Sequence, residues 1–244
     1  MNTIEAIIYD MDNTLINSRI KLGWDVKNAF ARLGTTITLE EAQTTKNWEA
    51  LATTHGHTLA EFWSSFNKRE TWKESIQQGT ATIFPETIPI LKTLQEKEYR
   101  LVLVSRSEEK ETMEKVQGFG LQTFFKKPYL VAPKRIRETR SKTKTIGYMN
   151  ALDQEGIAAE LITATQTIPI PTTIFIVGDS EEDVWAGEAL RRWTKTHPPY
   201  SQTTIITILV DRQGRKQTTR AQYTVQDLKV AYEVIKTYRM PRNT

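Results

Sequence analysis

The chain of 244 residues carries 33 Lys and Arg against 29 Asp and Glu, and hydrophobic residues make up 39% of it. This composition is typical of a folded globular protein and excludes a largely disordered chain. The absence of cysteine excludes disulfides, thiolate metal sites and cysteine nucleophiles. A chain of this length can form one large domain or one domain that carries a smaller insertion.

We expect no secretory leader, because residues 1–3 lead directly into the apolar run 4–9. No apolar run approaches the roughly 20 residues that are needed to span a bilayer. We therefore expect a soluble, cytoplasmic protein with no membrane contact. The sequence leaves its oligomeric state open.

Short apolar runs predict the strands of a sheet, at residues 4–9, 99–104, 129–132, 173–177 and 203–210. Helical patterns lie between them, at residues 86–98, 108–116, 144–155 and 183–193. Strands that alternate with helices favour an α/β fold with a doubly wound, Rossmann-like parallel sheet. In such sheets, ligands bind beyond the carboxyl ends of the strands.

The segment 17–85 interrupts this alternation, because its pattern is helical and contains no convincing strand. It predicts helices at residues 24–33, 39–52 and 59–76. Thr58 is a candidate N-cap for the last of these, with Glu61 three residues later. We therefore predict a core formed by residues 1–16 and 86–244, with residues 17–85 as a small inserted helical domain.

Two carboxylates, Asp10 and Asp12, directly follow the first predicted strand, and Thr14 completes a DxDxT pattern. Two carboxylates this close repel each other unless a cation lies between them. Mg²⁺ prefers such oxygen ligands, and an aspartate can also attack phosphorus as a nucleophile. The alternative interpretation is that both aspartates only cap a turn.

Further polar residues follow two other predicted strands. Asp179 and Asp183 come after the strand 173–177, and Ser105 and Arg106 come after the strand 99–104. The two carboxylates would face the same cleft as Asp10, although acidic residues are also ordinary choices at the start of a helix. Ser105 offers a hydroxyl, and Arg106 a cation, to a phosphate oxygen.

Positive charge gathers in the segment 126–144, which holds eight lysines and arginines against one acid, Glu138. The segment is either a solvated loop or a surface for an anionic substrate or nucleic acid. The first interpretation is favoured, because many surface loops are charged.

In order and spacing, these motifs resemble the haloacid dehalogenase-like hydrolase superfamily over nearly the whole chain. Residues 7–15 resemble its first motif, residues 103–105 its second, and residues 177–183 with 186–187 its fourth. Asn13 stands where a glycine is common, and asparagine also adopts turn conformations. The resemblance implies a phosphatase-type enzyme whose helical cap, inserted after the first motif, covers the site and selects the substrate.

The resemblance also implies residue roles. Asp10 would be the nucleophile and Asp12 the general acid and base. Asp10, Asp12 through its backbone carbonyl, and Asp179 would bind Mg²⁺, with Asp183 supporting them. Ser105 would bind the phosphoryl group of the substrate. We also expect Thr14 and Arg106 to bind substrate, although Arg106 stands where the family more often has a small or amide residue. The third motif supplies a lysine, for which Lys142 fits best and Lys144 is the alternative.

We therefore predict a Mg²⁺-dependent phosphohydrolase that acts on a small phosphomonoester through an aspartyl-phosphate. Asp12 argues against a dehalogenase, which does not need a proton donor at that position. A phosphomutase of the same superfamily remains an alternative. A nucleic-acid-binding protein, or a phosphatase of polynucleotide ends that uses residues 126–144, is possible but not favoured.

Overall fold

A computed structural model describes residues 4–45, 47–125, 128–130, 172–196, 200–214 and 220–238. Its main sheet has six parallel strands in the order β5-β4-β1-β6-β7-β8. They are β1 (Ile4–Asp10), β4 (Arg100–Ser105), β5 (Pro128–Leu130), β6 (Thr172–Gly178), β7 (Thr203–Val210) and β8 (Tyr223–Val225). The predicted α/β fold is confirmed.

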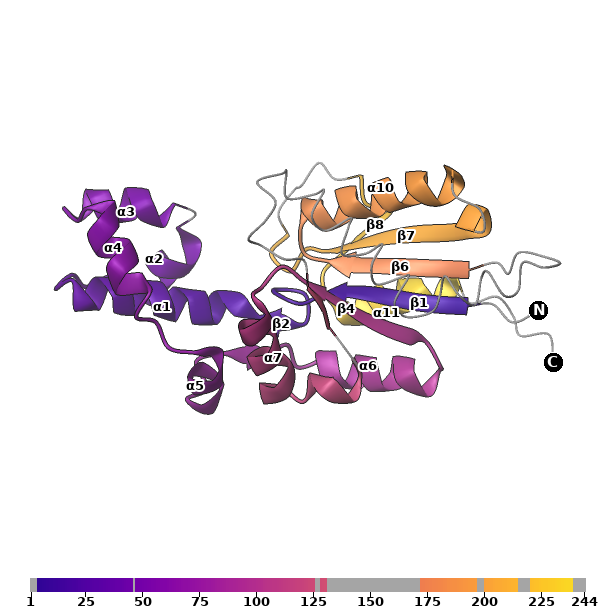
Figure 1. Ribbon diagram of the computed structural model, residues 1–244, viewed down its shortest axis with the longest axis horizontal. Helices are drawn as coiled ribbons and strands as arrows, with labels where there is room; N and C mark the ends of the chain where they lie inside the picture. Colours follow the sequence, from indigo (N-terminus) through magenta and orange to yellow (C-terminus); the bar gives the residue numbers. More distant parts are fainter. Residues whose placement is uncertain are drawn as a thin grey trace.

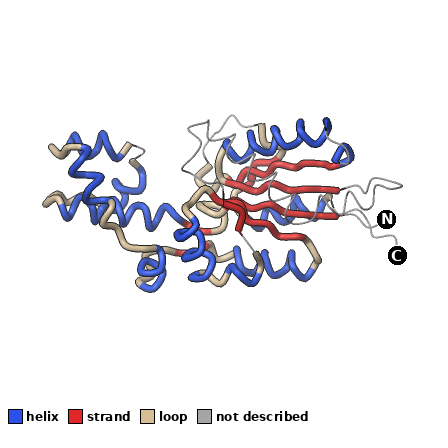
Figure 2. The backbone as a smooth tube through the Cα atoms, in the orientation of Figure 1, coloured by secondary structure: helices blue, strands red, loops and turns tan. Residues whose placement is uncertain are grey.

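Helices cover both faces of this sheet (Figure 1). One face packs against α10 (Glu181–Thr196), and the other lies over α6 (Thr87–Glu96) and α11 (Leu228–Thr237), with α7 (Glu109–Gly118) beside α6. Short 3₁₀ turns occur at Leu121–Thr123 and Tyr200–Gln202. Loops follow the strands at their carboxyl ends, as Figure 2 shows.

The position of β1 in the sheet explains where a crevice opens. It is buried on both faces, with Ala6, Ile7 and Ile8 fully covered, as expected for a strand inside a parallel sheet. The chain runs from β1 to β4 and β5 on one side, and then to β6, β7 and β8 on the other. The strand order therefore reverses at β1, and such a point opens a crevice at the carboxyl end of the sheet.

A helical segment is inserted between β2 (Ile16–Asn17) and β3 (Thr82–Ile83), two short strands that pair with each other. It comprises α1 (Ser18–Arg32), α2 (Leu39–Thr44), α3 (Trp48–Thr54), α4 (Leu59–Phe66) and α5 (Trp72–Gln77). Helices α1 to α4 project beyond the carboxyl ends of the sheet, whereas α5 lies beside α7 (Figure 1). The insertion thus stands over the end of the sheet where the first and fourth motifs lie.

The three helices predicted in this insertion differ in extent from those observed. The predicted helix 24–33 begins earlier, as α1 at Ser18–Arg32, and the other two are interrupted. The predicted helix 39–52 is broken between α2 and α3, because the Asn47 side chain caps a new helix by accepting a hydrogen bond from the Ala50 amide. The predicted helix 59–76 is likewise broken, because Thr71 and Glu74 form a second capping box that starts α5. The capping box of Thr58 with Glu61 is confirmed.

Elsewhere, the predicted strands 4–9, 99–104, 173–177 and 203–210 agree with the structure within one residue at each end. Strand β8 and helix α11 were not predicted. The predicted helix 144–155 and nearly all of the basic segment 126–144 lie outside the described residues, and the domain limits at residues 17 and 85 stay a prediction. No helix in the described parts of the chain is long and apolar enough to cross a bilayer.

Candidate active site

Three neighbouring strands bring the predicted site residues to one edge. Asp10 is the last residue of β1, Ser105 is the last residue of β4, and Asp179 directly follows β6. Strands β4 and β6 flank β1 on either side. Residues that are far apart in the sequence therefore meet where the strand order reverses.

An acidic group forms at this edge from Asp10, Asp179 and Asp183. One carboxylate oxygen from each lies within 4.8 Å of the others. Asp10 and Asp183 are only 6% and 2% exposed, so water screens their mutual repulsion poorly. A dication relieves this repulsion, and a set of three carboxylate oxygens suits Mg²⁺.

The position of Asp183 depends on a glycine and a helix start. Its carboxylate accepts hydrogen bonds from the Ser180 amide at 3.2 Å and the Ser180 hydroxyl at 2.6 Å. A Cβ atom on Gly178 would lie 2.2 Å from the Asp183 carboxyl carbon, so only glycine allows this approach. Asp183 therefore joins the acidic group and also stabilises the first turn of α10; the two interpretations of this residue are compatible.

A tight turn after β1 separates the two aspartates of the DxDxT pattern. The Leu15 and Ile16 amides both donate to the Met11 carbonyl, at 3.0 and 3.1 Å. Asn13 adopts a φ of +61°, a left-handed conformation that asparagine tolerates. Thr14 is fully buried and donates to Asp10 Oδ2 at 3.3 Å, so it contacts the predicted nucleophile directly.

Asp12 has a separate set of partners. Its carboxylate accepts hydrogen bonds from the Ser18 hydroxyl, from Ser107 Oγ at 2.9 Å, and from Lys115 Nζ at 2.8 and 2.9 Å. Burial acts to raise the pKa of Asp12, but the Lys115 ammonium and these hydrogen bonds outweigh it and hold that pKa below its usual value. The carboxylate of Asp12 is thus charged and fixed at one side of the acidic group.

Lys115 was missed by the sequence interpretation. It lies on α7, is only 2% exposed, and shares the inward face of that helix with Thr112 and Val116. A lysine at an apolar position of a helical pattern is the signal that could have identified it, because buried lysines need a charged partner. The lysines predicted for the third motif, Lys142 and Lys144, lie outside the described residues.

Ser105 and Arg106 differ in their surroundings. Ser105 is 1% exposed, and its hydroxyl accepts a hydrogen bond from the Ser107 amide at 3.1 Å. Arg106 forms an ion pair with Glu182 of α10 at 2.6 Å. Its guanidinium is therefore already paired, and its predicted contact with substrate stays a prediction.

A pocket of about 270 Å³ opens beside Asp179, between the turn after β1 and the loop after β7. Its lining includes Asn13, Asn17, Arg19, Phe84, Asp179, Val210, Asp211, Arg212 and Gln213. Arg212 stacks on Phe84, with 3.5 Å from its guanidinium carbon to the ring centroid, and pairs with Glu86 at 2.6 Å. Arg19 has no hydrogen-bond or ion-pair partner among the described residues.

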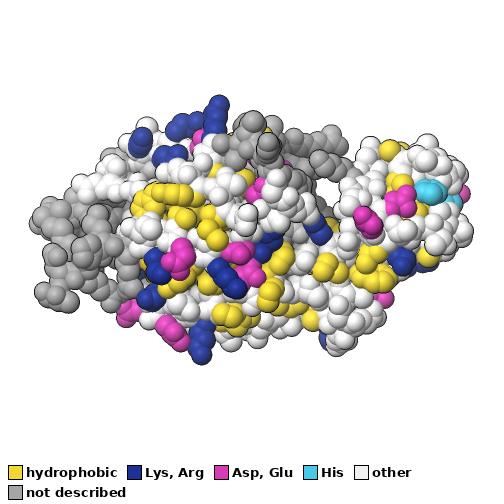
Figure 3. Space-filling model, turned by 180° about the vertical axis from the view of Figure 1, so that it is seen from behind, with side chains coloured by type: hydrophobic (Ala, Val, Ile, Leu, Met, Phe, Trp, Pro, Cys, Tyr) yellow, Lys and Arg dark blue, Asp and Glu magenta, His cyan; other side chains and the backbone are white. Residues whose placement is uncertain are grey.

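Charged side chains are interspersed over the face of the core in Figure 3, where positive and negative groups alternate. The imidazoles seen in that view lie on the lobe formed by the insertion. His57 contacts Thr35 Oγ1 at 2.7 Å and packs near Phe30, so its neighbours are residues of the insertion itself.

The model of the haloacid dehalogenase-like hydrolase family matches residues 7–191. The chain belongs to this family. The match confirms the resemblance seen in the motifs, and it makes the protein a hydrolase of this family. No significant match was found among curated proteins.

Solved structures with a similar fold share little sequence with this chain. A putative phosphatase from Clostridium difficile is 13% identical, with a TM-score of 0.63, over 96% of this chain and 100% of its own. A phosphatase of the same superfamily from Thermococcus onnurineus is 17% identical, with a TM-score of 0.58, over 97% and 100%. A family hydrolase from Deinococcus radiodurans, solved with bound phosphate and sodium, is 15% identical, with a TM-score of 0.59, over 96% of each chain. These similarities establish the shared fold.

Proposed function

We propose that this protein is a Mg²⁺-dependent phosphatase that hydrolyses a phosphomonoester through an aspartyl-phosphate on Asp10. The observation that carries the proposal is the separation of two kinds of carboxylate at one strand edge. Asp10, Asp179 and Asp183 form a group suited to a dication, whereas Asp12 is held apart by hydroxyl and ammonium donors. The similar structures described as phosphatases, and the one with bound phosphate, support it.

In the first step, a carboxylate oxygen of Asp10 attacks the phosphorus, and the bond to the leaving oxygen breaks. Asp12 donates a proton to that oxygen, so the product leaves as a neutral alcohol. Asp12 must therefore enter this step protonated, although Lys115 favours its charged form. The approach of the substrate dianion, which raises the proton affinity of a nearby carboxylate, favours this protonation.

In the second step, Asp12 accepts a proton from a water molecule, and the water oxygen attacks the phosphorus. The bond between phosphorus and Asp10 breaks, which releases inorganic phosphate and restores the carboxylate. Asp12 can act as the base here because it gave up its proton in the first step, and Lys115 favours the charged form. Two easier reactions thus replace one difficult hydrolysis.

Several residues would hold the reacting groups in place. Asp10, Asp179 and Asp183 would bind Mg²⁺, which when bound offsets the repulsion between the phosphate and the carboxylates. Ser105 lies on the neighbouring strand and would contact the phosphoryl oxygens. Thr14 donates to Asp10 Oδ2 and so helps to orient the nucleophile.

The substrate is proposed to be small. The pocket beside Asp179 has about 270 Å³ of space, and it contains Arg19 as an available cation for a polar substrate group. A phosphomutase and a phosphatase of polynucleotide ends remain alternatives. No contact among the described residues favours either, and nearly all of the basic segment 126–144 that motivated the second lies outside them.

Release of 4-nitrophenol from 4-nitrophenyl phosphate tests the proposal. Replacement of the nucleophile in Asp10→Asn is expected to lower kcat by more than about 1,000-fold. Removal of metal with EDTA is expected to abolish activity, and Mg²⁺ should restore it. Asp227→Asn is the matched control, because Asp227 caps α11 and asparagine caps equally well.

The two parts of the proposal fail separately. Normal activity of the Asp10→Asn protein would exclude Asp10 as the nucleophile. Full activity in EDTA would exclude the metal and leave the nucleophile assignment standing. The Asp227→Asn control should unfold at the same temperature and retain normal activity.

A further inference from the structure

Two buried lysines flank the indole ring of Trp72. Lys21, on α1 of the insertion, is 1% exposed, and its ammonium lies 5.4 Å from the ring centroid. Lys115, on α7 of the core, is 2% exposed, and its ammonium lies 4.2 Å from the ring centroid. Trp72 itself is 6% exposed. One aromatic ring therefore contacts a cation of the insertion and a cation of the core.

Lys115 uses its hydrogen-bonding capacity at the active site. Its ammonium donates to both carboxylate oxygens of Asp12, at 2.8 and 2.9 Å, and to Ser107 Oγ at 2.9 Å. Ser107 in turn donates to Asp12 Oδ2. An ammonium has three N–H groups, so these contacts account for all of them. Lys115 therefore ties both carboxylate oxygens of Asp12 to α7, and Ser18 and Ser107 are the other donors to that carboxylate.

Lys21 has the same chemistry but different partners. It donates to both carboxylate oxygens of Asp25, at 2.9 and 2.7 Å, and to the Glu70 carbonyl at 3.0 Å. These contacts join α1 to the segment that precedes α5, and they do not reach the acidic group at the strand ends. Lys21 is thus a natural comparison for Lys115, with a similar burial and a shared aromatic neighbour.

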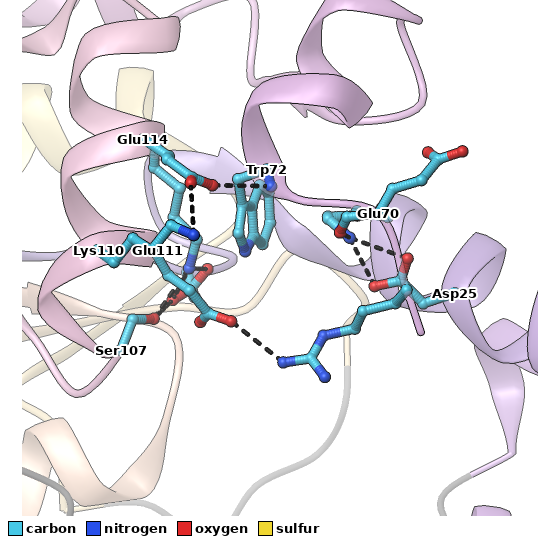
Figure 4. Close-up of polar contacts among 11 residues, drawn as sticks. Asp25, Glu70, Trp72, Ser107, Lys110, Glu111 and Glu114 are labelled. Atoms are coloured by element: carbon cyan, nitrogen blue, oxygen red, sulfur yellow. Dashed lines mark hydrogen bonds and ion pairs between the residues drawn. The ribbon is translucent and has the colours of Figure 1, made fainter. Parts of the chain in front are cut away.

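Helix α5 is attached firmly to the helix that carries Lys115. The Trp72 amide donates to Glu114 at 3.0 Å, and Arg69 pairs with Glu111 at 3.2 Å (Figure 4). Ile76 packs closely on Gly118, where a Cβ atom would lie 2.4 Å from Ile76 Cδ1. Trp72 belongs to the same apolar cluster as the sheet, whereas α1 to α4 share a cluster of their own. The insertion thus reaches the core mainly through α5.

We propose that Lys115 is a positioning residue that holds the Asp12 carboxylate for proton transfer, and that Trp72 of the insertion keeps Lys115 in place. This inference rests on the proposed function, because it assigns a support to the proton-transferring group. The indole ring covers the ammonium and excludes water, which would otherwise compete for its hydrogen bonds. Loss of the ring would free Lys115 to take other rotamers and would release Asp12 with it.

Phenyl phosphate and 4-nitrophenyl phosphate provide the test, because they are similar in shape but differ in the acidity of the leaving phenol. Phenolate needs a proton from Asp12 more than 4-nitrophenolate does. General acid catalysis contributes roughly 10²- to 10⁴-fold, so Lys115→Met should lower kcat/KM about 100-fold for phenyl phosphate and about tenfold for 4-nitrophenyl phosphate. Trp72→Leu should change the two values in the same direction, by a smaller factor.

The matched control replaces the other lysine together with its counter-ion. The double variant Lys21→Met with Asp25→Leu removes a buried ion pair next to the same ring, without leaving a charge unpaired. It should leave the ratio of the two kcat/KM values unchanged. A change in this ratio equal to that of Lys115→Met would overturn the proposal, because it would trace the effect to packing around Trp72.

Chemical rescue separates positioning from a general loss of structure. The chain has no cysteine, so Lys115→Cys introduces its only thiol. Alkylation with 2-bromoethylamine in denaturant, followed by refolding, returns an ammonium on a side chain of nearly the original length. The alkylated protein should recover the original ratio, whereas protein alkylated with ethyl bromide should not. Equal ratios in both would contradict the proposal.

The failure of this inference differs from the failure of the proposed function. If both substrates lose the same factor in Lys115→Met, Lys115 does not position Asp12, even though Asp10→Asn remains inactive. If the Asp10→Asn protein is active, the proposed function itself is wrong. Thermal unfolding of each variant shows whether it is folded at the assay temperature.

Discussion

The strand ends and the inserted helices are stabilised in different ways. The strand ends belong to a sheet whose central strand is buried on both faces, and their side chains are fixed by short polar contacts. The inserted helices α1 to α4 surround a separate cluster that includes Phe30, Phe62 and Phe66. The first region is built for precise placement of charge, and the second has a small core that can respond independently of the sheet. Mutations should therefore separate activity from local stability.

The largest effect is expected in the insertion. Phe62 is fully buried, and its ring lies 5.5 Å from that of Phe30 and 5.9 Å from that of Phe66. Phe62→Ala should destabilise the insertion by about 4 kcal/mol, because it removes a large side chain from a small cluster. Hydrogen exchange should show lost protection in α1 and α4, with unchanged protection in β1.

Leu59→Ala is the matched control for Phe62, because Leu59 lies on the same helix and is 45% exposed. Its effect should stay within about 0.5 kcal/mol. If Phe62→Ala also exposed the amides of β1, the insertion and the sheet would unfold as one unit, and the comparison between the two regions would fail.

A smaller effect, on activity, is expected at the strand ends. Gly178→Ala places a Cβ atom where the Asp183 carboxylate lies, so Asp183 must move by about an ångström. A displacement of that size costs about 100-fold in kcat, which corresponds to about 2.7 kcal/mol. Steady-state kinetics with 4-nitrophenyl phosphate at saturating Mg²⁺ measure this loss.

Gly187→Ala provides the comparison for Gly178. A Cβ atom there would lie 2.3 Å from Thr207 Cγ2, which is an equally close contact between α10 and β7. This variant should lower the melting temperature while kcat changes by less than about threefold. Equal losses of kcat in the two variants would show that the sheet, and not the position of Asp183, determines the rate.

The smallest effect is expected at the two capping boxes. Thr58→Ala and Thr71→Ala each remove a side chain that accepts a hydrogen bond from a helix amide, at a cost of about 1 kcal/mol. Both variants should lower the stability of the insertion in chemical denaturation. Only Thr71→Ala should also lower kcat, since Thr71 precedes the helix that carries Trp72; equal kcat values would separate α5 from the active site.

The sequence could place a side chain where its residue type and its position after a strand were enough. Asp10 and Asp179 could be placed because each follows a buried apolar strand, and parallel strands end at the same edge. Short helices were less predictable, since the breaks near Asn47 and Thr71 depend on capping contacts inside a continuous helical pattern. Helix α11 was missed although its Asp227 is an ordinary N-cap.

Lys115 was not predictable from motif spacing, because its role depends on tertiary contacts. It meets Asp12 across 103 positions of the chain, and the aromatic ring that covers it comes from a third segment. The pairing of Arg106 with Glu182 likewise arises only when the fold brings the residue after β4 to the start of α10. The positions of the site carboxylates could thus be inferred from the predicted strands. The partners of Lys115 and Arg106 could be identified only from the folded structure.

The pairing of β2 with β3 has a consequence for the history of such a chain. The residues through which the polypeptide leaves the sheet and returns to it, Ile16 and Ile83, are direct partners in a two-stranded ladder. Adjacent entry and exit points allow an insertion to be lengthened, shortened or exchanged without disturbing its host. In this chain, however, an exchanged segment would also have to supply an aromatic ring over Lys115. Exchange of the inserted segment is therefore limited by one side chain. In a recombined protein, the position of Trp72 would have to hold an aromatic residue.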